Sequence, residues 1–152
     1  MPDDRQHLKH WDVLVPGDDG ADGEILKEAY GRFSDRGVGE IELVNYGGSL
    51  FSGSGAKRAV RVTRRDIEVE VSAQAMGSEV FISWDVYYRP SWSDRMPNLF
   101  RTVLPAGEKQ DVMAFASVTL NETKALATDF AMRQGRSLPS EDESSGVLGP
   151  LD

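Results

Sequence analysis

The stretch RAVRVTRRDIEVEVSAQAMGSEVFISWDVYYR, residues 58–89, decides the fold class because it predicts three consecutive antiparallel strands. Two-residue turns at residues 65–66 and 77–78 would join them, and the glycine that opens the second turn suits type II′ geometry. Both turns independently put the apolar positions of the three strands on one face, and a slip of one residue would destroy this agreement. The predicted pairs are Val60 with Val71, Arg61 with Glu70, Val62 with Val69, Ile67 with Tyr88, Val69 with Val86, Val71 with Trp84, Ala73 with Ile82 and Ala75 with Val80.

Two helices and a further strand are predicted to flank this meander. The segment 22–36 has an apolar stripe at helical spacing, Asp22 as a candidate N-cap and Gly37 as a residue suited to end the helix. A strand is predicted over 40–46 by its alternation of apolar and acidic residues. The apolar stripe of the segment 121–134 predicts a second helix.

The segment 111–120 fits either a strand or the first part of that second helix, because a short apolar run does not distinguish the two. The order of elements predicts an α+β domain, with an antiparallel meander sheet of about four to five strands packed against an N-terminal and a C-terminal helix. We expect an acidic arm over 1–20, a single domain over 21–135, and an acidic, disordered tail over 136–152.

The composition limits the function classes. The chain has 152 residues, a formal net charge of −8 and no cysteine, which excludes disulfides, thiolate nucleophiles and cysteine-ligated metals. Residues 57–65 carry five basic side chains, but the acidic balance of the chain argues against nucleic acid as a partner. No apolar run is long enough to span a bilayer, and the N-terminus lacks the apolar core of a secretory signal. We therefore expect a cytoplasmic protein.

Three stretches imitate known binding motifs but lack a decisive residue. Residues 18–29 imitate a calcium loop without the glutamate at its last position. The glycine-rich segment 46–58 has Ser54 where a phosphate-binding loop needs lysine, and a strand follows instead of a helix. His7 and His10 would share a face if the arm were helical, but without a second ligand cluster we interpret the arm as solvated. We therefore predict neither a metal nor a cofactor.

Two carboxylates form the only enzyme-like pattern that we consider. Glu70 and Asp85 are predicted to face each other across neighbouring strands, an arrangement that acid–base enzymes use. Arg61 on the third strand is placed to bridge them, and we expect no histidine nearby to assist. We interpret the set as structural and predict no catalytic residue.

The face of the meander opposite the predicted core combines aromatic and acidic residues. Clustered exposed aromatics are typical of interfaces, and carboxylates steer basic groups of a partner. We therefore expect a non-catalytic interaction protein (an adaptor, chaperone or inhibitor) that binds another protein or a second copy of itself. The residues expected to make contact are Phe81, Tyr87, Trp92, Glu68, Glu70 and Asp85.

An alternative is a domain that binds a small apolar ligand between a curved sheet and the C-terminal helix. The small residues Ala73 and Ala75 would leave space there. This alternative predicts a cavity lined by Trp84, Val71 and Phe130, whereas the interaction hypothesis predicts a filled core.

Overall fold

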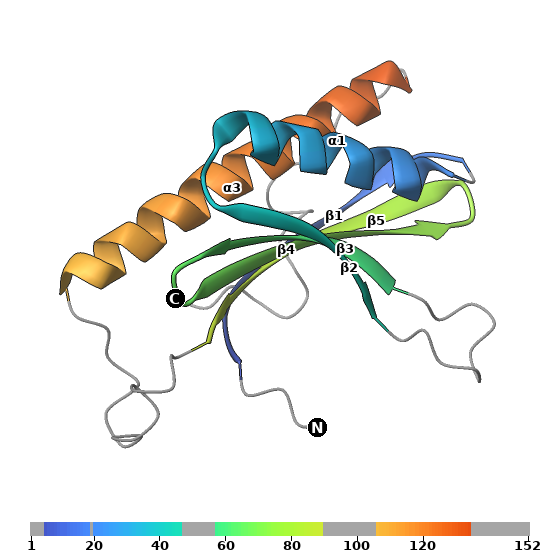
Figure 1. The fold of residues 1–152 in the computed structure, drawn as a ribbon. Coiled ribbons are helices and arrows are strands. Elements are labelled where there is room, and N and C mark those ends of the chain that lie inside the picture. Colours follow the sequence, from blue (N-terminus) through green and yellow to red (C-terminus); the bar gives the residue numbers. More distant parts are fainter. Residues whose placement is uncertain (1–4, 19, 47–56, 90–105, 135–152) are drawn as a thin grey trace.

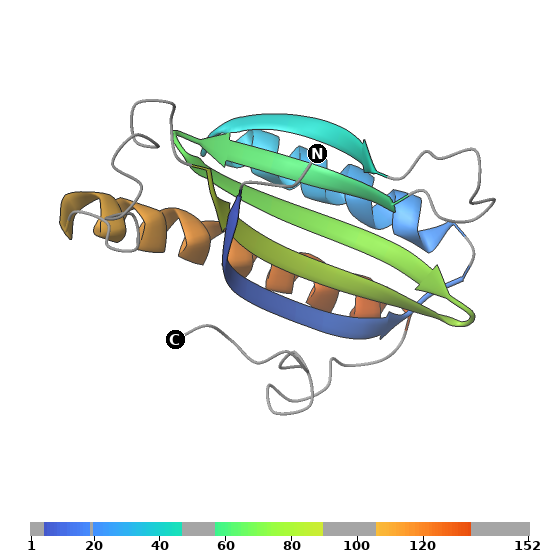
Figure 2. The same ribbon diagram turned by 90° about the horizontal axis from the view of Figure 1, so that it is seen from below.

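The computed structural model describes residues 5–18, 20–46, 57–89 and 106–134. In these residues both helices lie on one face of a five-stranded antiparallel sheet with the strand order β1-β5-β4-β3-β2 (Figure 1). A view from below shows the other face of the sheet in front of the helices (Figure 2). The elements are β1 (Gln6–Pro16), α1 (Ala21–Arg36), β2 (Glu40–Tyr46), β3 (Lys57–Arg64), β4 (Ile67–Met76), β5 (Glu79–Tyr88) and α3 (Ala106–Arg133). The predicted α+β fold is confirmed.

The register of the central strands agrees with the prediction at every predicted pair. β3 and β4 place Val62 opposite Val69 and Arg61 opposite Glu70. β4 and β5 pair over their full lengths, from Ile67 with Tyr88 to Met76 with Glu79. The apolar side chains of this meander point toward the helices because successive residues of a strand alternate between the two faces.

The helix α1 begins two residues earlier than the sequence indicates. Its N-cap is Gly20 in a left-handed conformation rather than Asp22, which lies in the first turn, where the helix dipole favours a carboxylate. The end of the helix agrees with the prediction. Gly37 is also left-handed, and its N–H donates to the carbonyl groups of Phe33 and Ser34.

The expectation of a solvated acidic arm over 1–20 is corrected, because residues 6–16 form the edge strand β1, which pairs with β5. Trp11, Val13 and Val15 are buried and point toward the helices. Their alternation with polar residues is a strand pattern, in which Asp12 pairs with Ser83 on the side that faces away from the core. The net charge of the arm therefore masked its strand pattern.

The ambiguous segment 111–120 is part of one continuous helix, α3. Its apparent alternation is accidental, since Ala116 is buried whereas Ala114 is exposed. The side chains that face the sheet recur at helical spacing along the whole helix. The buried residues of α3 are Phe115, Ala116, Thr119, Thr123, Leu126, Ala127, Phe130 and Ala131.

A single hydrophobic cluster fills the space between the sheet and the two helices. Trp84 is the largest fully buried side chain in it. The indole Nε1 of Trp84 donates a hydrogen bond to Thr119 Oγ1 at 3.1 Å, which ties β5 to α3. Across the described ranges, neither helix has both the length and the apolar character that crossing a bilayer requires.

Candidate functional site on the open face of the sheet

We call the face of the sheet that points away from α1 and α3 the open face (Figure 2). It carries the polar positions of the strands, because the apolar positions point toward the helices. Among the described elements, none packs against it. Its side chains include His7, His10, Asp12 and Leu14 from β1, Phe81, Ser83, Asp85 and Tyr87 from β5, Glu68, Glu70, Ser72, Gln74 and Met76 from β4, and Arg61 from β3.

The centre of the open face is a cluster of ion pairs around two glutamates of β4. Glu68 and Glu70 are only 7% and 4% exposed. The Nη1 atom of Arg5 lies 3.0 Å from Glu68 Oε1 and 2.5 Å from Glu70 Oε2. Arg61 Nε lies 3.1 Å from Glu70 Oε2, and Arg89 Nε lies 2.8 Å from Glu68 Oε2. Burying a carboxylate is costly unless it is paired and hydrogen-bonded, so these guanidinium groups offset the desolvation cost of the two buried glutamates.

The predicted carboxylate pair is present, but its surroundings differ from the expectation. Glu70 and Asp85 are direct partners in the ladder between β4 and β5. Arg61 contacts Glu70, whereas Asp85 is contacted by His7 and His10. The expectation that no histidine lies near this pair is therefore wrong.

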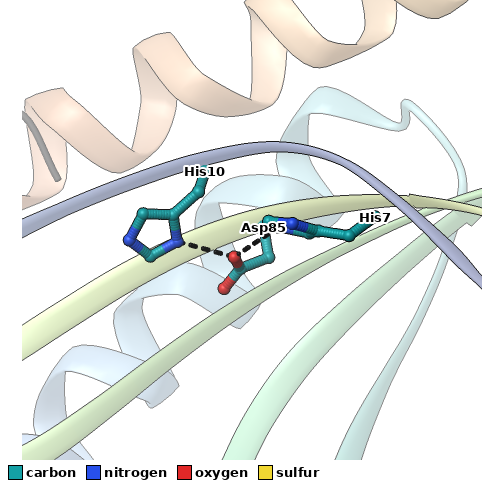
Figure 3. A group of neighbouring side chains, drawn as sticks. All are labelled: His7, His10 and Asp85. Atoms are coloured by element: carbon teal, nitrogen blue, oxygen red, sulfur yellow. Dashed lines mark hydrogen bonds and ion pairs between the residues drawn. The ribbon is translucent and has the colours of Figure 1, made fainter. Parts of the chain in front are cut away.

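The two histidines reach the same place because β1 is irregular. A spacing of three residues puts side chains on opposite faces of a regular strand. The register of β1 shifts between His7 and Lys9, so that His7 pairs with Tyr87 and His10 with Asp85, only two positions apart on β5. A β-bulge of this kind inserts one extra residue and re-aims the side chains beside it. Both imidazole rings consequently point toward Asp85 (Figure 3).

The resulting cluster places one carboxylate oxygen between two imidazoles. His7 Nε2 lies 2.9 Å from Asp85 Oδ1, and His10 Nδ1 lies 2.6 Å from the same atom (Figure 3). The other ring nitrogen of His10, Nε2, lies 2.5 Å from Asp12 Oδ2. Burial lowers the pKa of His10, but the hydrogen bonds and charges of Asp85 and Asp12 outweigh it, so the pKa is raised above its ordinary value of 6.5.

Tyr87 connects the histidines to the ion-pair cluster. The Arg5 guanidinium group lies over its ring at 4.1 Å from the centroid, within the range of a cation–π contact. The His7 ring centroid lies 5.2 Å from that of Tyr87. The tyrosine is half-buried and contacts both groups.

The other end of the open face, at the turn between β4 and β5, is apolar. Phe81 is half-buried and pairs with Leu14 on β1, which is 44% exposed. Met76 on β4 is 57% exposed and lies diagonally across from Phe81, since the direct partner of Phe81 there is Gln74. We call Leu14, Met76 and Phe81 the apolar end.

The residues expected to contact a partner lie in three different surroundings. Phe81, Tyr87 and Asp85 are partly exposed on the open face. Glu68 and Glu70 are on the same face but buried beneath their arginine partners. Trp92 lies outside the described residues.

Sequence reasoning missed the role of the N-terminal residues. Arg5, His7 and His10 complete the polar clusters of the open face, yet they lie in the segment assigned to a solvated arm. The alternation of buried residues in β1 was the available signal for a strand. The position of the bulge, which brings the histidines together, has no such signal.

The chain matches no protein-family model, no curated protein and no solved structure.

Proposed function

We propose that the protein is a non-catalytic interaction domain that binds a partner protein through the open face of its sheet. The observation that carries this proposal is the one-sided arrangement of the described elements, with both helices on one face and an apolar end exposed on the other. Apolar side chains on an otherwise polar sheet face are typical of a surface that a partner covers.

The apolar end is suited to act as the anchor of such an interface. Phe81 offers a large apolar area from a rigid strand, and little conformational entropy is lost when it is covered. Leu14 and Met76 flank it on the neighbouring strands and would enlarge the contact.

The polar part of the open face supports recognition rather than anchoring. Arg5 and Tyr87 are held in place by several contacts, so their side chains need little ordering on binding. Asp85 and Asp12 add partly exposed negative charge, which favours a partner that presents basic groups.

Binding assays with surface variants test this proposal. We expect Leu14→Ser/Phe81→Ser to lose a partner that the wild-type protein captures, with the loss then measured as affinity between the purified components. Tyr30→Ser is the matched control, because Tyr30 is an exposed aromatic on α1, on the other side of the molecule. Light scattering of the isolated protein distinguishes a separate partner from a second copy of the chain. Equal binding by the wild type and the double variant would refute the proposed interface.

The alternative function, binding of a small apolar ligand, has less support from the geometry. Trp84, Val71 and Phe130, the predicted lining, belong to the packed core cluster. An open pocket of about 280 Å³ lies elsewhere, between α3, the end of α1 and β3, where Phe115 and Val118 contribute to its wall. Native mass spectrometry that shows a retained small molecule would favour this alternative.

A further inference from the structure

The cluster formed by His7, His10 and Asp85 has the donor set of a transition-metal site. Two imidazole nitrogens and one carboxylate oxygen, offered by side chains of β1 and β5, lie within 4.8 Å of one another. Imidazole nitrogen is a preferred ligand of zinc and of other late first-row divalent ions, and two histidines with one carboxylate form a known set that leaves further positions open.

The spacing of the donor atoms is close to what a metal requires. For metal–ligand bonds of about 2.0–2.2 Å, neighbouring donor atoms lie roughly 2.8–3.6 Å apart in octahedral or tetrahedral geometry. The two histidine nitrogens lie 2.9 and 2.6 Å from Asp85 Oδ1. The two histidine nitrogens themselves lie within 4.8 Å of each other, so side-chain rotations that bring the three donors to this spacing would admit an ion between them.

An independent feature of the site is the second carboxylate behind His10. A histidine that binds a metal through one ring nitrogen usually donates its other N–H to a carboxylate, which fixes the tautomer and the ring orientation. Asp12 Oδ2 lies 2.5 Å from His10 Nε2, on the side of the ring away from Asp85. This arrangement leaves His10 Nδ1 as the nitrogen that would face the ion.

The charge of the surroundings also suits a cation. Among the described residues of the open face, the carboxylates Asp12, Asp85, Glu42, Glu68 and Glu70 outnumber the guanidinium groups of Arg5, Arg61 and Arg89, and His7 and His10 are the basic groups nearest to Asp85. A divalent ion would therefore relieve an excess of negative charge. The side chain of His7 is 38% exposed, so an ion has access to the site from solvent.

The geometry points to a binding site for a divalent transition metal of the zinc type, with His7 Nε2, His10 Nδ1 and Asp85 as ligands and Asp12 as the carboxylate that orients His10. The remaining coordination positions face the open side of the sheet, where water or a donor group of a second molecule completes them. This inference goes beyond the proposed interaction function and stands independently of it, because it needs no partner.

Calorimetric titration of the untagged full-length protein with zinc chloride tests the site. We expect saturable binding of one ion per chain, and no comparable binding of magnesium, which prefers oxygen ligands. His7 and His10 are the only histidines of the chain. Their imidazole signals in a nitrogen-15 NMR spectrum should therefore both shift as zinc is added, which identifies the ligands directly.

Four variants within the cluster and one control outside it separate this site from adventitious binding. Asp12→Asn should weaken zinc binding roughly 10–100-fold, as the loss of such a carboxylate does elsewhere. His10→Gln and Asp85→Asn should weaken it at least as much, since each removes a ligand. His7→Gln, at the most exposed ligand, tests the same prediction without disturbing the core, with circular dichroism as the check on folding. Asp18→Asn removes an exposed carboxylate outside the cluster and should leave the affinity unchanged.

Two results would overturn the inference. One is the absence of saturable zinc binding to the wild-type protein while both histidine signals stay in place. The other is binding of equal affinity in the wild type, His7→Gln and Asp85→Asn, which would place the ion elsewhere on an acidic surface.

Discussion

Replacing Thr119 by valine tests whether the hydrogen bond between β5 and α3 matters for the stability of the fold. Thr119 is fully buried, and its hydroxyl oxygen accepts from the indole N–H of Trp84 at 3.1 Å. Valine has nearly the same shape, so the change creates no large cavity but leaves the Trp84 donor buried without this acceptor. Leaving one buried polar group unsatisfied costs about 1–3 kcal/mol. We expect the free energy of unfolding to fall by that amount.

Thr123 provides a matched control one turn further along α3. It is also fully buried, but its hydroxyl donates to the backbone carbonyl of Thr119 at 2.8 Å, and that carbonyl belongs to the hydrogen-bonded helix. Removing this hydroxyl therefore leaves no buried donor without an acceptor, and Thr123→Val should change the free energy of unfolding by less than about 0.5 kcal/mol. Urea unfolding followed by tryptophan fluorescence measures both variants, with equal slopes required for the comparison. If the two valine variants have the same midpoint, the Trp84 hydrogen bond does not contribute as argued.

Three further predictions concern charge, strand register and helix propensity. Glu70→Gln should lower the free energy of unfolding by roughly 3 kcal/mol, because it breaks a buried ion pair. Glu42→Gln, which breaks an exposed ion pair, should lower it by less than about 1 kcal/mol. Urea unfolding of the two variants measures the difference. Val13→Asp should abolish folding, since Val13 points into the core, whereas Leu14→Asp should be tolerated, since Leu14 is exposed on the open face. The circular dichroism spectra of the two proteins test whether β1 has the register described. Gly31→Ala should raise the stability by up to about 1 kcal/mol in thermal unfolding, because a methyl group meets no atom there and alanine favours the helix; a lower melting temperature would contradict this.

The part of the fold that the sequence could predict is the part with local, redundant signals. Two short turns and a repeated alternation specified the register of β3, β4 and β5, because every apolar side chain had to agree on one face. The end of α1 at Gly37 was predictable for a similar reason, since few other residues adopt the left-handed conformation there. Helix and strand in residues 111–120 were not separable, because the side chains that settle the question belong to the sheet on which α3 packs.

The candidate site was only half predictable, because its two halves come from segments far apart in the chain. The carboxylates and aromatics of β4 and β5 follow from the register of the meander. Their partners Arg5, His7 and His10 depend on β1 joining the sheet beside β5, which is the last strand in the sequence. The local sequence predicts neither the pairing of β1 with β5 nor the extra residue in β1.

The bulge in β1, which the sequence does not predict, determines the chemistry of the open face. A regular strand would leave one of the two histidines facing the helices, where an imidazole would be buried among apolar side chains at a considerable cost. One extra residue between His7 and His10 avoids that cost and brings both rings to Asp85 at once. A variant that deletes Leu8 would place His7 and His10 two residues apart in a regular strand, so both rings should stay at Asp85 while the core pairs of β1, from Trp11 onward, keep their partners. The same deletion should preserve the joint response of the two histidines to zinc, and loss of that response would contradict this account of the bulge. The placement of both rings on one face of this edge strand, which the bulge achieves for a spacing of three residues, and not the presence of two histidines alone, would then be what creates the site.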